Sequence, residues 1–290
     1  MLKKPFTPGQ IFSFERIIDK EGYLICDTSA VSQLALSSKN VYQTKSFSDF
    51  SLDSIEGEIE KISIFLEFME NPKILLTSKV SEEIRRIRDR LGTKIHFLRE
   101  NYNLRRNGRK PCDEKPIEQI KLEEIHELYN ELHRASRRSV FFPGQRQIYS
   151  FLEKIVLSVT RNTDAKIDYG FFYRKDDKPR KREDPHTDEQ LVATALYLSA
   201  FERRRGGILT RDSDIKRILR NTLFYLNNSG QQGYVEIVHL LRENPISLYH
   251  VEENKEARLI IDSSWAYPFE VNNIVSPEKI RTISVDLSTV

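Results

Sequence analysis

The chain has 290 residues, of which 39% are hydrophobic and 10% aromatic, with 46 Lys and Arg against 43 Asp and Glu. This composition excludes a wholly disordered chain and predicts about two globular domains, or one domain with a large insertion. No stretch reaches the roughly 18 consecutive apolar residues that a membrane helix needs. The first residues lack the apolar core of a secretory signal, so we expect a cytoplasmic protein without a membrane anchor.

The net charge of +3 hides a strong asymmetry along the chain. Residues 85–110 contain ten Lys and Arg against two Asp and Glu, which is a local charge of +8. Residues 111–133 carry −5 and residues 134–182 carry +8, so this third of the chain sums to +11 and the remainder to −8. Such concentrated positive charge predicts a polyanionic partner, and nucleic acid is the first candidate. The two cysteines, Cys26 and Cys112, are too few for a disulfide framework.

Short apolar runs alternate with helical patterns over the first 90 residues or so of the chain. The segment 22–27 reads as a buried strand ending in a carboxylate, with Thr28 and Ser29 as caps of the next helix. The expected order is strand 22–27, helix 30–36, a serine-rich loop 37–54, helix 55–69, strand 73–77 and a helix from residue 78.

The rest of the chain divides into a helical insertion and a return to the strand–helix pattern. Within the insertion we expect the end of a long basic helix, helices 117–138 and 145–161, and a charged linker 174–182. After it we expect an amphipathic helix 187–205 capped by Thr187 and ended by Gly206-Gly207, then a strand at 208–210. The last expected elements are helix 212–226, strand 235–241, and a β-hairpin of 246–252 and 257–261.

Alternating strands and helices predict an α/β fold with a central parallel sheet covered on both faces. We expect four segments: residues 1–92 as the first half of the core, residues 93–182 as a basic helical insertion, residues 183–241 as the second half of the core, and residues 242–290 as a C-terminal extension with a hairpin. In sheets of this kind the functional site lies at the carboxyl ends of the strands.

Several carboxylates are expected at that edge. Asp27 and Asp212 each follow a predicted strand, and Glu83 lies on the rim of an apolar helical stripe while Glu82 falls on the solvated side. Asp188 is in register with the apolar face of its own helix. Taken singly, each of these acids is poor evidence for a function, because an Asp at a helix N-cap or a Glu on a helix rim is structural in most proteins, and Asp214 competes with Asp212 for the same role.

Four converging acids would repel one another unless a cation neutralised them, and such oxygen ligands suit Mg²⁺ or Mn²⁺. A bound metal of this type polarises a phosphoryl oxygen and activates water. The pattern therefore predicts a metal-dependent hydrolase that cleaves phosphodiester bonds.

Four motifs resemble those of the PIN-domain ribonuclease family, and the chain looks like a large member with a basic helical insertion. They are Ile25-Cys26-Asp27-Thr28-Ser29-Ala30-Val31, Thr77-Ser78-Lys79-Val80-Ser81-Glu82-Glu83-Ile84, Thr187-Asp188-Glu189-Gln190-Leu191-Val192-Ala193-Thr194-Ala195-Leu196 and Ile208-Leu209-Thr210-Arg211-Asp212-Ser213-Asp214-Ile215. The resemblance implies a Rossmann-like α/β/α sandwich, Mg²⁺ or Mn²⁺, and endonucleolytic cleavage of mostly single-stranded RNA. It also implies the site residues: Asp27, Glu83, Asp188 and Asp212 as catalytic metal ligands, Asp214 as an accessory metal-site acid, and Ser29 and Thr210 as supporting polar groups.

The basic stretch is expected to hold the RNA. The predicted phosphate contacts are Arg85, Arg86, Arg105, Arg106, Arg137, Arg138, Arg180, Lys181 and Arg182. The alternative is a purely structural role, in which acidic residues 118–131 pair with these arginines in a solvated bundle.

Two other functions compete with the nuclease. One is a catalytically silent RNA-binding or scaffold protein of the same fold, in which the acids only cap helices. The other is a phosphatase with Asp27 as nucleophile, which is disfavoured because Ser29 stands where such enzymes usually carry a second Asp. The sequence leaves open whether the chain forms a homodimer or pairs with an inhibitory protein.

Overall fold

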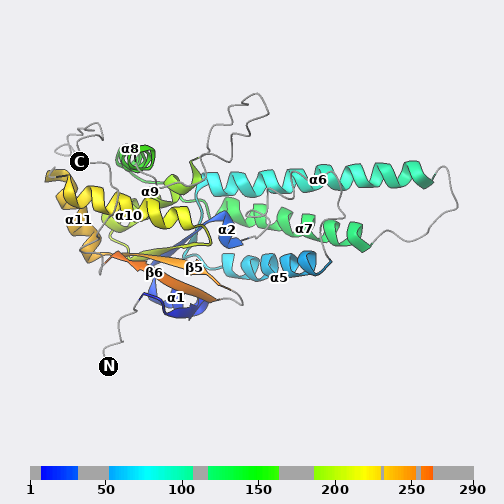
Figure 1. Cartoon of the computed structure of the whole chain (residues 1–290), viewed down its shortest axis with the longest axis horizontal. Coiled ribbons are helices and arrows are strands. Elements are labelled where there is room, and N and C mark those ends of the chain that lie inside the picture. Colours follow the sequence, from blue (N-terminus) through cyan, green and yellow to red (C-terminus); the bar gives the residue numbers. More distant parts are fainter. Residues whose placement is uncertain are drawn as a thin grey trace. The chain divides into compact units, whose positions relative to one another are not determined.

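A computed structural model describes residues 8–31, 52–106, 117–162, 186–229, 232–252 and 256–263. The chain forms two compact units, one made of residues 1–27 and 141–290 and the other of residues 28–140. Helices and strands are mixed in the α/β manner that the sequence predicts (Figure 1). The predicted loop 37–54 and linker 174–182 lie largely or wholly outside the described residues.

The first unit is built on a mixed sheet with strand order β1-β6-β5-β4-β2. Strands β2 (Tyr23–Cys26), β4 (Gly206–Thr210) and β5 (Ile246–Val251) run parallel, as predicted for the central sheet. Strand β6 (Glu256–Asp262) is antiparallel to both β5 and β1 (Ile11–Ser13). The predicted hairpin is therefore confirmed, but its first strand belongs to the parallel portion of the sheet.

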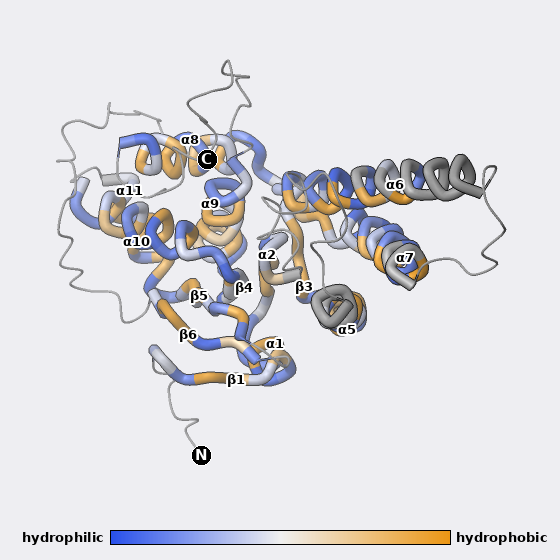
Figure 2. The backbone as a smooth tube through the Cα atoms, turned by 45° about the vertical axis from the view of Figure 1, so that its right-hand side comes forward, coloured by the Kyte–Doolittle hydropathy of each residue, from blue (hydrophilic) through white to orange (hydrophobic). Residues whose placement is uncertain are grey.

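Helix α9 (Thr187–Ala200) packs across β2, β4 and β5. The other helices of the unit are α1 (Phe14–Lys20), α8 (Arg146–Asn162), α10 (Ser213–Asn228) and α11 (Gln232–Glu243). Of these, α8, α10 and α11 pack against α9. Hydrophobic and hydrophilic residues alternate along α8 and α10, which is the pattern of helices with one buried side (Figure 2). None of the helices in the described residues is long and apolar enough to cross a membrane.

Three details predicted for helix α9 are wrong. Every residue from Leu191 to Ala200 is buried, so α9 is apolar all round rather than amphipathic. It ends at Ala200 and not at Arg205, and Gly206-Gly207 begin β4 instead of ending the helix. Thr187 is the first helical residue, while the cap position belongs to His186, which has a left-handed backbone.

The predicted strand 235–241 is also wrong, because this segment is helix α11. Its β-branched residues favour a strand, but the apolar positions recur at helical spacing. Tyr234, Ile237, Val238 and Leu241 are buried, whereas Val235 is exposed. The strand that pairs with β4 on the side away from β2 is β5.

The second unit is mainly helical. It contains α2 (Thr28–Val31), α5 (Leu52–Met69), β3 (Ile74–Leu75), α6 (Ser78–Arg106) and α7 (Ile117–Arg138). Helices α5 and α6 both pack against α7. The backbone N–H of Leu76 donates to the carbonyl of Ser139 at 2.9 Å, which joins the end of β3 to the chain after α7. The helices predicted at 55–69, from 78 onward and at 117–138 are confirmed. Residue 93, the expected start of the insertion, lies inside α6 and not at a boundary between elements.

A buried ionic network closes the end of the sheet opposite to the carboxyl ends of β2 and β4. The Glu21 side chain is fully buried and accepts a hydrogen bond from the Tyr249 hydroxyl at 2.5 Å. Arg205 lies 3.3 Å from Glu21 and 3.0 Å from Asp262, and Lys20 lies within 3.6 Å of both acids. Because two acids face two bases, the cluster is neutral overall and keeps these buried charges partnered. It ties α1 to β4, β5 and β6.

The Tyr23 ring of β2 packs directly against Gly206 of β4. A Cβ atom at Gly206 would overlap the ring of Tyr23, whose hydroxyl donates to the Ala195 carbonyl at 3.0 Å. The ring therefore fills the space that a side chain at position 206 would need. This close packing sets the register in which Tyr23 faces Gly206 and Cys26 faces Leu209.

We expect Gly206→Ala to lower the free energy of unfolding by about 1–3 kcal/mol, the usual cost of overpacking a buried site. Urea denaturation of both proteins measures this difference. Gly144→Ala is the matched control in the same unit, because its Cβ would meet only the Tyr197 hydroxyl at 3.8 Å. Equal losses in the two variants would contradict the packing argument.

Candidate active site

Parallel pairing of β2 with β4 brings two predicted site residues together at the carboxyl ends of these strands. Asp27 directly follows β2, is 5% exposed, and donates its backbone N–H to the Leu209 carbonyl of β4 at 3.0 Å. Its Oδ2 accepts a hydrogen bond from the Thr210 hydroxyl at 3.0 Å. The preceding residue, Cys26, is a buried free thiol, and burial raises its pKa.

Thr210 connects Asp27 to the next carboxylate. Its hydroxyl oxygen accepts a hydrogen bond from the backbone N–H of Asp212 at 2.8 Å. Asp212 is the N-cap of α10, where its Oδ1 accepts from the backbone N–H of Asp214 at 2.8 Å. One hydroxyl thus fixes the Asp27 side chain and the backbone from which Asp212 projects. Capping uses one of the two Asp212 carboxylate oxygens.

Asp214, the accessory acid implied by the resemblance, lies in the first turn of α10. Its side chain is 14% exposed, and its Oδ1 is 4.0 Å from the guanidinium of Arg217. This ion pair is at the distance limit, so it screens the carboxylate only weakly. Of the two acids that the sequence does not separate, Asp212 is the one linked to Asp27 through Thr210.

Asp188 lies in the first turn of α9 and is half-buried. Sequence periodicity places it on the inner face, but α9 is buried on nearly all sides, so periodicity does not discriminate here. The fully buried acid of this turn is Glu189, which lies 3.7 Å from Nδ1 of His186. The sequence signal that could have identified Glu189 is the nearly continuous apolar run after residue 190, because a helix that is hydrophobic all round is buried.

Glu83 and Ser29 belong to the second unit. Glu83 accepts a hydrogen bond from the Thr28 hydroxyl at 2.5 Å, whereas Glu82 faces arginines on the exposed side of α6. The two glutamates therefore separate as the helical periodicity predicts. Thr28, expected to cap a helix, is instead its first residue and the partner of Glu83, and Ser29 is buried beside it.

The described residues hold no group of three or more His, Cys, Asp and Glu side chains arranged to bind a metal ion. The linked pair of Asp27 and Asp212 is the arrangement that the structure offers in the first unit. Two carboxylates are sufficient protein ligands for Mg²⁺, which keeps several waters and takes further oxygens from substrate phosphates. The donor set therefore fits a hard cation.

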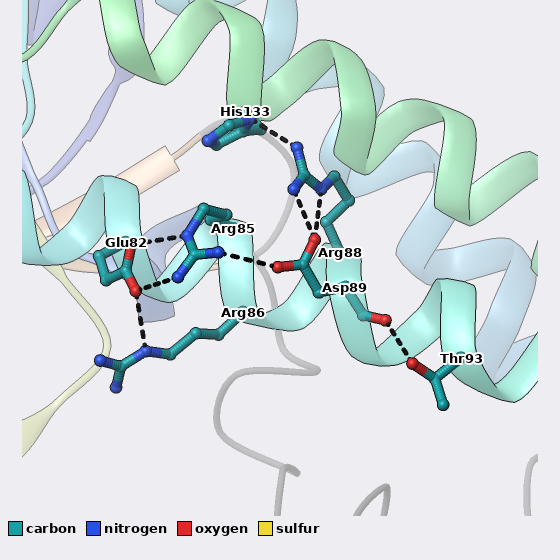
Figure 3. Close-up of polar contacts among 7 residues, drawn as sticks. All are labelled: Glu82, Arg85, Arg86, Arg88, Asp89, Thr93 and His133. Atoms are coloured by element: carbon teal, nitrogen blue, oxygen red, sulfur yellow. Dashed lines mark hydrogen bonds and ion pairs between the residues drawn. The ribbon is translucent and has the colours of Figure 1, made fainter.

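The basic face of α6 forms a separate cluster in the second unit (Figure 3). Arg85 donates to Glu82 at 2.5 and 2.7 Å and to Asp89 at 3.1 Å, and Arg86 donates to Glu82 at 3.2 Å. These hydrogen bonds lower the pKa of Glu82 to about 2. The two arginines predicted to contact RNA here are therefore already paired, with acids of their own helix rather than with residues 118–131.

The remaining predicted RNA contacts fall in three places. Arg137 and Arg138 are exposed in the last turn of α7. Arg105 and Arg106 end α6, but their side chains lie outside the description. Residues 180–182 are not among the described residues.

His133 of α7 completes the cluster. Its Nδ1 lies 2.8 Å from Nη1 of Arg88, which also donates to Asp89. A guanidinium can only donate, so Nδ1 must accept and the imidazole is neutral. Burial, followed by the charges of Arg88 and Arg137, lowers the pKa of His133 below its ordinary value.

Comparisons with known proteins add no relative to this description. No protein-family model matches the sequence, and neither curated proteins nor solved structures gave a significant match. The arguments about function therefore depend on the residues and their geometry.

We expect Thr210→Val to lower the free energy of unfolding by about 1–3 kcal/mol, because Asp27 loses a donor and the Asp212 N–H loses its acceptor. Chemical denaturation of the wild type and the variant measures the loss. Thr210→Ser, which keeps the hydroxyl, should recover most of it. Equal losses in both variants would show that the methyl group matters and the hydrogen bonds do not.

We expect His133 to titrate below its ordinary pKa of 6.5, and Arg88→Gln to raise that pKa. The unfolded chain binds a proton here at higher pH than the folded protein does. The stability contributed by His133 is therefore full above pH 6.5 and is lost as the pH falls toward the folded pKa. NMR titration of the imidazole signals in the wild type and in Arg88→Gln measures both values. An unchanged pKa in Arg88→Gln would contradict the electrostatic cause.

Proposed function

We propose that this chain is a metal-dependent endoribonuclease with a PIN-like core, and that Asp27 and Asp212 form the centre of its active site. The observation that supports the proposal is the Thr210 hydroxyl, which links Asp27 to Asp212 at the carboxyl ends of two parallel strands. This edge is where α/β sheets place their functional groups.

Asp27 and Asp212 would hold Mg²⁺ or Mn²⁺ between them. When bound, the cation supplies charge neutralisation at the phosphoryl oxygens and a lowered pKa for a coordinated water. The side chains of this chain would orient the metal ligands. Thr210 is a positioning residue, because its hydroxyl donates a hydrogen bond to the Asp27 carboxylate. Burial of Asp27 limits its motion and strengthens its attraction for a cation, because water screens the charge poorly there.

Three further acids belong to the proposed metal site, and the observations that support them differ. Asp188 and Asp214 belong to the same unit as Asp27, and we propose them as accessory acids in metal binding. Glu83, the fourth ligand implied by the family resemblance, lies in the second unit and stays a prediction from the sequence.

RNA is the proposed substrate because of the charge distribution. Residues 85–182 carry +11, and the paired arginines of α6 leave the exposed arginines at the end of α7 as the described candidates for phosphate contact. The family resemblance favours single strands, whose backbone can enter an active site without duplex opening.

A catalytically silent RNA-binding or scaffold protein is the second candidate, and one observation favours it. Asp212 caps α10, and Asp27 accepts a hydrogen bond from the Thr210 hydroxyl. Both acids therefore stabilise the fold without any metal. In that case the acids would persist for stability and the basic residues for binding.

The deciding experiment is cleavage of labelled single-stranded RNA, and of DNA of matching sequence, with Mn²⁺, Mg²⁺ or EDTA. We expect metal-dependent cleavage of RNA that falls by at least about 100-fold in Asp27→Asn, since even groups that only support a metal ligand typically contribute 10–100-fold. The matched control is Asp19→Asn, an exposed aspartate of the same unit, which should cleave like the wild type.

Each outcome assigns the chain to one function. Equal activity in Asp27→Asn and the wild type, or activity that survives EDTA, would overturn the proposed site. Absence of cleavage together with tight RNA binding by both proteins would favour the scaffold. Preferential cleavage of DNA would keep the nuclease and change its substrate.

A further inference from the structure

A pocket of about 900 Å³ lies in the second unit between the end of α5, strand β3 and the end of α7. This volume is in the range of sites that bind small molecules or single nucleotides. Some of the lining is apolar and comes from all three elements: Leu66, Met69, Ile74, Leu75, Ala135 and Val140. Met69 and Ile74 are buried, and the partly exposed Leu66, Leu75, Ala135 and Val140 offer a surface on which a flat ring can lie.

Charged residues of both signs line the pocket. Arg134 and Arg138 come from α7, which also contributes Glu131, and Glu67 and Glu70 come from the end of α5. The carboxyl end of α5 adds the partial negative charge of its terminal carbonyl groups to the acidic side. The pocket is thus suited to a ligand with an anionic group at one end and hydrogen-bond donors at the other.

The two arginines are well placed for a phosphate. They are four residues apart on α7, so their side chains are neighbours on one face of the helix. Both are exposed, and among the described residues neither takes part in an ion pair, in contrast to Arg85 and Arg88 of α6. Guanidinium groups bind phosphate oxygens through charge-assisted hydrogen bonds, often two at a time.

The acidic side complements the edge of a base. Carboxylates such as those of Glu67 and Glu70 accept hydrogen bonds from exocyclic amino groups. Cytosine, adenine and guanine carry such a group and uracil does not. Proteins that recognise single-stranded RNA commonly hold unstacked bases in this way, with the ring on a side-chain surface and the base edge hydrogen-bonded.

We infer that this pocket binds one unstacked nucleotide of RNA, with its phosphate on Arg134 and Arg138, its base on the apolar lining, and an amino group toward Glu67 and Glu70. The site lies in a different unit from Asp27 and Asp212, and only the choice of RNA as ligand rests on the proposed function. It would give the chain a preference for bases that carry an amino group at one position of its ligand.

Calorimetric titration of the full chain with CMP, GMP, AMP and UMP, in low salt and without metal, tests this inference. We expect the three amino-bearing nucleotides to bind more tightly than UMP. Cytidine, which lacks the phosphate, should bind at least about tenfold more weakly than CMP. Arg134→Gln and Arg138→Gln should each weaken CMP binding by about tenfold. Arg146→Gln is the matched control, because Arg146 is an exposed arginine outside the pocket lining and outside the predicted RNA contacts.

A second set of variants tests the acidic side. Glu67→Gln and Glu70→Gln should reduce the difference between CMP and UMP, while Glu127→Gln, an exposed position of α7 outside the lining, should keep it. Thermal melting verifies that each variant is folded.

The inference is wrong if no nucleotide binds, or if Arg134→Gln and Arg138→Gln bind CMP as the wild type does. Tighter binding of a zwitterionic dipeptide than of any nucleotide would assign the pocket to peptides and overturn it as well. These results are independent of catalysis, because Asp27→Asn should bind CMP normally. A chain that binds CMP but cleaves no RNA would refute the nuclease alone, and one that cleaves RNA but binds no nucleotide here would refute the pocket alone.

Discussion

The parallel pairing of β2 with β4 is the constraint on which the candidate active site depends. Gly206 leaves room for the Tyr23 ring, and this contact sets the register that brings Asp27 next to Thr210. A slip of one residue would turn Thr210 to the opposite face of the sheet and separate it from the Asp27 carboxylate. The hydroxyl bridge from Asp27 to Asp212 therefore follows from the packing of an aromatic ring at the far end of the same strand pair.

The two ends of this strand pair solve the problem of buried charge in different ways. At one end Glu21 and Asp262 are neutralised by Lys20 and Arg205, so the cluster needs no ligand and serves the fold. At the other end the buried Asp27 carboxylate accepts a hydrogen bond from the Thr210 hydroxyl, which also accepts one from the backbone N–H of Asp212. The proposed cation is assigned to the carboxyl ends of the strands because this link joins two predicted metal-site acids there.

The described arginines of residues 85–182 lie in two different settings, one on α6 and one at the end of α7. On α6, Arg85, Arg86 and Arg88 pair with acids of their own helix, and Arg88 also holds His133 in its neutral form. Any phosphate bound there must compete with a carboxylate, so this face contributes less to RNA binding than its composition indicates. The end of α7 differs because its arginines border an open pocket.

The sequence by itself determined the α/β alternation, the main helices and the acids at the ends of two strands, because apolar spacing and helix caps are local signals. It did not separate strand from helix at 235–241, where β-branched residues and helical spacing compete, and it did not identify Glu189 as the buried acid of α9. The Thr210 bridge, the contact between Arg88 and His133, and the pocket beside Arg138 were decided by the tertiary structure. Each depends on residues far apart in the chain or on the packing around them, and the free energy of such contacts is absent from any single segment.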